Sequence, residues 1–261
     1  MTSPKLRTAA RKLVIANRRA EMQFAAALRA TVAGIVRLYA KRLSAAVGAT
    51  GRDDGKNARP PSGKASPEWR VEVAKLEKST LPQIAPIVEA LHAKMAKQIV
   101  KNHAEIMGTV LGLPVNSQTT RVKAAVASSR NAAIEYVEKA HRVYADQVRA
   151  VFGSGEADGL RVEVLRDRLL ERGDVSESRA ELIARDQTLK LAGAINEARQ
   201  KDAGLTYFVW STSNDERVRP EHAALDNQVF DWSALPEPGA PGQDFQCRCV
   251  AIPYVPELEG I

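Results

Sequence analysis

The chain has 261 residues, a formal net charge of +7, only 5% aromatic residues and abundant alanine, a composition that favours packed helices over sheets. No apolar run approaches the roughly 20 residues that a membrane-spanning helix needs, and the amino terminus lacks the pattern of a secretory signal. The two cysteines, separated by one residue, offer no disulfide framework. The sequence therefore predicts a helical protein of a reducing compartment, such as a bacterial cytoplasm, with no membrane partner.

Positive charge is concentrated in the first quarter of the chain. Residues 1–64 carry 14 Lys and Arg against 3 Asp and Glu, whereas residues 201–261 carry 4 against 10. One basic end and one acidic end indicate two different partners, or a fixed orientation in one assembly. The candidates for DNA contact are Arg11, Lys12, Arg18 and Arg19. No groove-reading motif accompanies them, so a solvated helical face is the alternative.

Apolar residues recur at helical spacing along most of the chain, beginning with a long helix over residues 5–47. A stretch rich in Gly and Pro follows at 48–66 and predicts a flexible linker. Further helices are expected over residues 67–78, 87–111, 117–151, 160–172 and 174–203, divided by Pro82 and Pro86, by Gly112 and Pro114, by Gly153 and by Gly173. His92, His103 and His141 lie on these helices without acidic or cysteine neighbours at ligand spacing, so we interpret them as surface or packing residues.

The hydrophobic period changes after Gly204. Residues 206–212 are β-prone and rich in aromatics, residues 249–254 are a second strand candidate, and Val229-Phe230 supplies a short third. They predict a small antiparallel sheet packed on the preceding helix. The expected fold is mainly α, with long amino-terminal helices followed by a helix plus a short antiparallel sheet in a small α+β carboxy-terminal module. The expected domains are a basic helical arm (1–47), a flexible linker (48–66), a helical region (67–155) and the module (156–261).

Reactive and charged side chains gather between Tyr207 and Pro253. The acid–base cluster and the only cysteines are Asp215, Glu216, Arg217, Arg219, His222, Asp226, Cys247 and Cys249. Because residues i and i+2 of a strand point to the same face, the two cysteines can present both sulfurs to one zinc ion. His222 is the third candidate ligand, and Asp215 or Asp226 the fourth. In the alternative interpretation, the cysteines are small buried hydrophobes and the histidine bonds a carboxylate.

The same residues allow two further interpretations. A Cys, His and Asp set can act as nucleophile, base and orienting acid. Asp215, Glu216, Arg217 and His222 can instead act as a metal-dependent nuclease cluster. Neither arrangement has a local signature such as a nucleophile elbow. Alternatively, two arginines pin the irregular loop 233–244, because guanidinium binds carboxylate through two parallel hydrogen bonds. The groups concerned are Arg217 and Arg219 with Asp215, Asp226 and Asp244. We favour this scaffold role, and we expect Trp210 to be a core anchor, whereas the place of Trp232 stays open.

The block resembles the phage head morphogenesis family, also called the Mu F-like minor head proteins. The similar stretches are Trp210–Ser213, Asp215–His222, Leu225-Asp226 and Asp244–Cys249, together with the helical residues 179–188. Two departures stand out, because the family usually has an acidic residue after an Ile-Ala-Arg-Thr step and a Gly after the Leu-Asp pair. This chain has Asp186-Gln187 and Asn227 there, and Asn tolerates a left-handed backbone nearly as Gly does. The resemblance covers roughly residues 160–255.

The resemblance implies a minor capsid protein that acts without catalysis in head morphogenesis of a tailed phage or prophage. It implies a place in the virion, at the portal vertex or inside the head, after assembly in the host cytoplasm, and a part in genome packaging or delivery. The implied partners are the portal protein, scaffold or major capsid protein, with packaged double-stranded DNA as a further candidate. The alternatives are a zinc-dependent enzyme built on His222, Cys247 and Cys249, and a DNA-binding packaging accessory protein.

Overall fold

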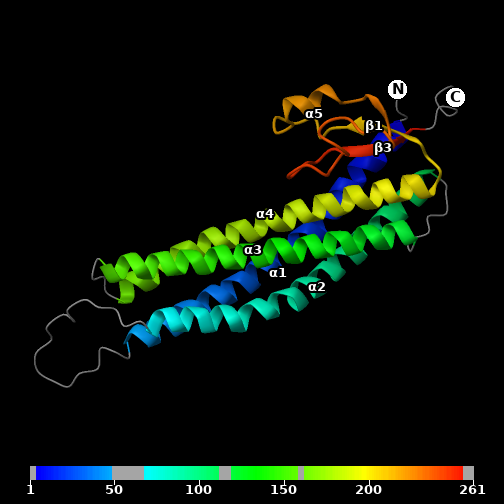
Figure 1. Cartoon of the computed structure of the whole chain (residues 1–261). Coiled ribbons are helices and arrows are strands. Elements are labelled where there is room, and N and C mark those ends of the chain that lie inside the picture. The colour runs from blue at the N-terminus through cyan, green and yellow to red at the C-terminus, as the bar shows by residue number, and fades with distance from the viewer. Residues whose placement is uncertain (1–3, 49–67, 112–118, 158–161, 255–261) are drawn as a thin grey trace, which may run out of the picture. The chain divides into compact units, whose positions relative to one another are not determined.

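The computed structural model describes residues 4–48, 68–111, 119–157 and 162–254 (Figure 1). Its elements are α1 (Pro4–Gly48), α2 (Glu68–Leu111), α3 (Thr120–Ala157), α4 (Val162–Asp202), β1 (Tyr207–Ser211), α5 (Pro220–Ala224), β2 (Val229–Asp231) and β3 (Val250–Tyr254). The expected fold, long helices followed by a small antiparallel sheet, is confirmed. The linker predicted at 48–66 lies, from residue 49 onward, outside the described residues. None of the described helices is both long and apolar enough to cross a membrane.

The breaks predicted inside the helices are wrong. The second helix continues through Pro82 and Pro86, the third runs past Gly153, and the fourth runs through Gly173. Around the prolines, buried Ile84 and Val88 face the core, so tertiary packing outweighs local helix propensity. A Cβ on Gly173 would come within 2.5 Å of a methyl group of Val36, so this glycine permits close packing of α4 on α1 instead of ending a helix.

The chain folds into two compact units, each assembled from separate stretches of sequence. Unit 1 comprises residues 1–25, 91–133 and 184–261, and unit 2 comprises residues 26–90 and 134–183. The core of unit 2 joins all four long helices through Val36, Tyr39, Leu43, Trp69, Val73, Leu76, Tyr144, Val148, Val151, Phe152, Leu165 and Leu169. Each of the four helices therefore contributes to both units.

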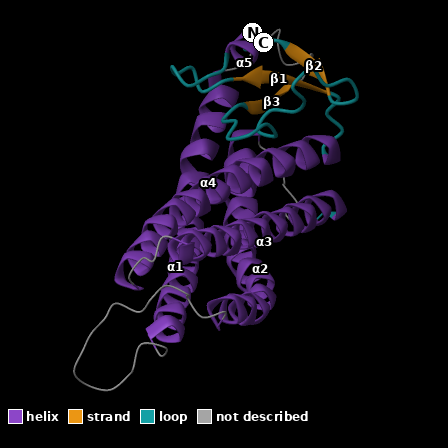
Figure 2. Cartoon of the chain, turned by 60° about the vertical axis from the view of Figure 1, so that its left-hand side comes forward, coloured by secondary structure: helices purple, strands orange, loops and turns teal. Residues whose placement is uncertain are grey.

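The sheet of unit 1 has the strand order β2-β1-β3, with both pairings antiparallel (Figure 2). Successive residues of a strand point to opposite faces, and both faces of β1 are covered. Val209 packs with Ile252 and with Ala10 of α1 on one side, whereas Phe208 and Trp210 pack on the other into a cluster with Trp232 and both cysteines. The first turns of α1 are thus part of the core of unit 1, and Trp232 belongs to that core as well.

A buried polar network fastens β3 to α4. Asn196 and Gln200 both donate to the carbonyl of Ala251, at 2.7 and 2.9 Å. Arg199 Nη1 donates to Nδ1 of His103 at 2.9 Å, so Nε2 of His103 carries the proton and donates to Asn196 Oδ1 at 3.0 Å. Burial, with Arg199 close by, lowers the pKa of His103 from 6.5 to about 4. The histidine is therefore a neutral link in the network and fits the packing interpretation.

Acidification is expected to destabilise the protein through His103. The unfolded chain protonates this histidine below its ordinary pKa of 6.5, whereas the folded chain resists until about pH 4. Its stabilising contribution is complete above pH 6.5 and falls between pH 6.5 and 4, with a loss of about 2 kcal/mol by pH 5. His103→Gln keeps an acceptor and a donor without a titrating group, so the decrease in unfolding free energy from pH 7 to pH 5 should shrink by about that amount. Denaturant unfolding at both pH values measures this, and an unchanged decrease would contradict it.

Candidate functional site

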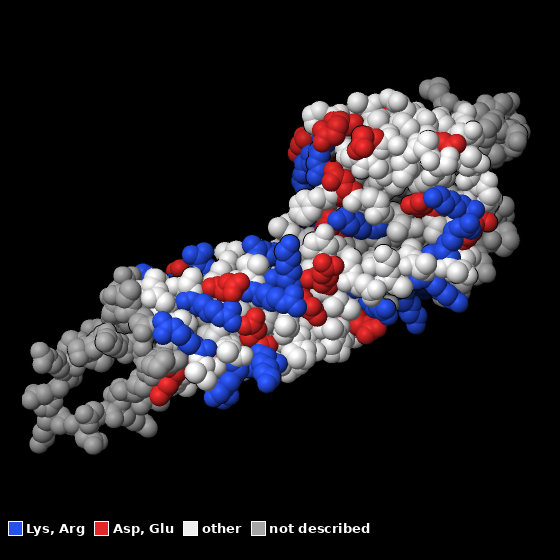
Figure 3. Space-filling view, in the orientation of Figure 1, with Lys and Arg blue, Asp and Glu red and all other residues white. Residues whose placement is uncertain are grey.

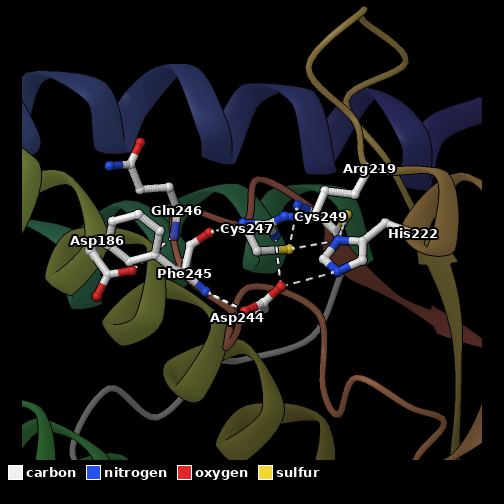
Figure 4. Close-up of polar contacts among 8 residues, drawn as sticks. All are labelled: Asp186, Arg219, His222, Asp244, Phe245, Gln246, Cys247 and Cys249. Carbon is white, nitrogen blue, oxygen red and sulfur yellow. Dashed lines mark hydrogen bonds and ion pairs between the residues drawn. The ribbon is translucent and has the colours of Figure 1, made fainter.

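The structure brings His222, Cys247 and Cys249 together in the interior of unit 1. Nδ1 of His222 lies 3.4 Å from Sγ of Cys247 and 3.5 Å from Sγ of Cys249. All three side chains are buried, and their three candidate ligand atoms lie within 4.8 Å of one another. In Figure 4 the histidine ring faces the sulfurs on one side and the carboxylate of Asp244 on the other.

Local structure explains how these side chains meet. His222 lies on α5, which begins with Pro220 at a position where the missing N–H is no loss, and its ring meets Trp210 edge-on at 5.5 Å. The cysteines do not lie in a strand, because β3 begins at Val250, one residue later than expected. They lie instead in the loop that enters β3, where the N–H of Cys249 donates to Sγ of Cys247 at 3.4 Å. The loop, not a strand pleat, turns both sulfurs toward the histidine.

Asp244 connects the histidine to an arginine. Its Oδ2 lies 3.4 Å from Nε2 of His222 and accepts a hydrogen bond from Arg219 Nη1 at 2.6 Å. Arg219 also donates to the carbonyl of Phe245 at 2.7 Å. The pairing of Arg219 with Asp244 agrees with the expected loop scaffold, in which a guanidinium group satisfies irregular backbone.

A second ion pair joins the cysteine loop to the segment that follows β1. Arg248 makes two parallel bonds to the carboxylate of Asp215, at 2.5 and 2.6 Å, and this contact holds the pKa of that carboxyl below its usual range. The N–H of Arg217 also donates to Asp215, so Arg217 contributes its backbone there, and Arg248 contributes the guanidinium. Sequence reasoning missed Arg248, although its place between the two cysteines was a usable signal.

Asp226 serves the end of β1. Its Oδ1 accepts from the N–H of Thr212 at 2.7 Å and from the hydroxyl of Thr212 at 3.0 Å, and its Oδ2 accepts from Asn227. Asn227 has a φ of 63°, so it adopts the left-handed backbone that the sequence led us to expect there. The structure does not bring Asp226 into the group formed by the histidine and the cysteines.

Asp186 of α4 holds the cysteine loop against the helix. This buried carboxylate, drawn with Gln246 in Figure 4, accepts from the N–H of Gln246 at 2.8 Å. It also pairs with Lys190 at 2.9 Å. Gly193, two turns further along, lets the loop approach, because a Cβ there would come within 2.9 Å of the carbonyl of Pro241. Sequence reasoning gave Asp186 no role; an acidic residue on an otherwise buried helix face was the available signal.

Comparison with known proteins places these elements in one family. Residues 146–252, from the end of α3 to β3, match the family described as phage Mu protein F like protein. These residues are similar to that family, and we call them the Mu F-like region. The resemblance stated from the sequence is thereby confirmed. The matched residues include α4, β1, α5, β2, the first part of β3, the Cys/His group and both ion pairs.

A curated protein matches a longer stretch of the chain than residues 146–252. An uncharacterized protein of Haemophilus influenzae (strain ATCC 51907 / DSM 11121 / KW20 / Rd) is 33% identical over 172 residues, which are 62% of this chain and 38% of the relative. The chain thus spans less than two fifths of that protein's length. No solved structure matches the chain significantly.

The two cysteines of the Mu F-like region differ in acidity. A hydrogen bond from Cys249, backbone N–H groups and nearby His222 lower the pKa of Cys247 to about 6, against the effect of burial. The same contact and burial raise the pKa of Cys249. Cys247 is therefore the more acidic of the two thiols, and the thiolate is the form of cysteine that binds metals and attacks electrophiles.

A cationic pocket of about 440 Å³ borders the Cys/His group. Its lining includes Arg18, Arg185, Arg217, Arg219 and Arg248. Of these, Arg185 pairs with Glu21 of α1 at 3.1 Å. The pocket gives the Mu F-like region an opening beside the buried sulfurs, with more positive than negative charge around it.

The basic residues chosen as candidates for DNA contact, Arg11, Lys12, Arg18 and Arg19, are all exposed on α1. On the face drawn in Figure 3, however, Lys and Arg side chains are interspersed with Asp and Glu. A DNA-binding surface usually gathers its positive charge in one patch or stripe. DNA contact by these four residues therefore stays a prediction.

Proposed function

We propose that the chain is a minor head protein of a tailed phage or prophage and acts in head morphogenesis as a component of the virion. The observation that carries this proposal is the family match over residues 146–252, which includes the Cys/His group and both ion pairs. We place the protein at the portal vertex or inside the head, with the portal protein, scaffold or major capsid protein as its partner. There it assists genome packaging or delivery.

The geometry supports an assembly role over catalysis. Asp215, an acid that the nuclease alternative would use to hold a metal ion, is bound by Arg248 instead, and nearby Asp226 is bound by Thr212. These bonds hold the loops in place, so the surface of the Mu F-like region is available to contact a partner protein. Large apolar side chains are exposed on that surface, including Phe245, which is 55% exposed. These side chains are available for contact with a protein partner.

The test uses the full chain, because unit 1 combines residues 1–25 and 91–133 with the carboxy-terminal part, and a fragment would lack part of its core. The tagged chain is mixed with the portal, scaffold and major capsid proteins of its own phage, and purified heads are analysed by mass spectrometry. We expect a stable complex with one of these proteins, and the chain in the heads. Absence from heads without any such complex would refute the proposal. Strong binding to duplex DNA that weakens steeply with salt would favour the packaging accessory role instead.

A further inference from the structure

We propose that His222, Cys247 and Cys249 bind one zinc ion, through Nδ1 of the histidine and Sγ of both cysteines. The proposal rests on the geometry of this group and does not depend on the function in head assembly. Cysteine sulfur and histidine nitrogen are the ligands that zinc prefers at tetrahedral sites.

The distances in the group fit a tetrahedral ion. Zinc bonds sulfur at about 2.3 Å and imidazole nitrogen at about 2.0–2.1 Å, so at the tetrahedral angle a nitrogen and a sulfur ligand lie roughly 3.6 Å apart. The observed separations of Nδ1 from the two sulfurs are 3.4 and 3.5 Å. Both nitrogen–sulfur separations therefore suit zinc, and all three ligand atoms lie within 4.8 Å of one another.

The surroundings of the histidine also suit a metal ligand. A histidine that binds zinc usually offers its other ring nitrogen to a carboxylate, which fixes the ring and its tautomer. Nε2 of His222 is buried, makes no hydrogen bond and lies 3.4 Å from Oδ2 of Asp244, a carboxylate that Arg219 holds in place. A shift of about half an ångström would make this contact an ordinary hydrogen bond. Asp244 is thus a positioning residue for the site.

The described residues supply three ligands, and a water molecule can fill the fourth position. Of the two fourth ligands considered from the sequence, Asp215 is bound to Arg248, and Asp226 is bound to Thr212 and Asn227. The Cys/His group borders the cationic pocket, through which solvent can reach the ion. Zinc with three protein ligands commonly carries a water molecule in the remaining position. The ion would join α5 to the loop before β3, so it would stiffen the centre of the Mu F-like region.

Elemental analysis and native mass spectrometry of the full chain, purified with a reductant, test the site. We expect one zinc per chain, lost in Cys247→Ser and His222→Gln. The matched control is His92→Gln, which changes a buried histidine bonded to Ser129 and should retain the metal. Asp244→Asn should keep the site but weaken its zinc affinity by about 10- to 100-fold. Circular dichroism of each variant separates loss of ligand from loss of fold.

Adding cobalt(II) to the metal-free chain is a second test, because the absorption spectrum of the bound ion reports which atoms coordinate it. Two thiolates in a tetrahedral site should give sulfur-to-cobalt charge-transfer absorption, and Cys247→Ser should weaken it. The proposal fails if the chain neither retains zinc nor binds zinc or cobalt(II) on titration. It also fails if folded Cys247→Ser and His222→Gln variants bind zinc as the parent does. Either failure would leave the proposal of head assembly standing.

Discussion

Trp210→Ala is expected to lower the free energy of unfolding by about 3–5 kcal/mol. Trp210 lies in the central strand, is 0% exposed, and meets the rings of His222 and Phe230 edge-on. Its removal leaves a cavity between the sheet and the Cys/His group that rigid neighbours cannot refill. Denaturant unfolding followed by far-ultraviolet circular dichroism measures the loss.

The matched control is Tyr207→Ala, in the same strand. Tyr207 is 41% exposed, so the loss of free energy should stay below about 1 kcal/mol. Both variants truncate an aromatic side chain of β1, so the difference between them is that one removes a buried side chain and the other an exposed one. Equal losses would mean that the strand's own propensity, and not the core beneath it, determines stability.

The sequence was sufficient to predict the elements whose signal is local. The three strands follow from β-prone residues around Phe208, Phe230 and Ile252, and they appear within a residue or two of the expected positions. The contact between Arg219 and Asp244 was expected because an irregular loop needs side-chain partners for its backbone. The meeting of His222 with the cysteines followed from the chemistry of those residue types, although a loop and not a strand produces it.

The features that the sequence could not predict depend on contacts between residues far apart in the chain. Pro82 normally ends a helix, but here the helix is held by burial against partners far along the chain. His103 shows no pattern in sequence because its partners, Asn196 and Arg199, are more than 90 residues away. Gly173 carries the usual signal of a helix end, and only the presence of Val36 above it explains why the helix continues.

The second large effect is expected at Asp186, where α4 holds the cysteine loop. Asp186→Ala leaves the N–H of Gln246 without its acceptor and Lys190 without its carboxylate, at a cost of about 2–3 kcal/mol in unfolding free energy. Asp186→Asn keeps an oxygen that can accept from the same N–H. It loses the ion pair with a partly exposed lysine and the 3.2 Å hydrogen bond that Gln187 Nε2 donates to the other carboxylate oxygen. We therefore expect a loss of about 1 kcal/mol or less for the asparagine variant.

Hydrogen exchange at the amide of Gln246 distinguishes this contact from a general loss of stability. The amide should exchange rapidly in Asp186→Ala and stay protected in Asp186→Asn, whereas amides of unit 2 should change little in either variant. If both variants protect the amide equally, another acceptor replaces the carboxylate and Asp186 does not hold the loop. Because Gln246 directly precedes Cys247, the carboxylate of Asp186 also determines the position of the Sγ atom of Cys247. Asp186→Ala should consequently disturb the meeting of Cys247 with His222, which connects the fourth helix to the chemistry of the site.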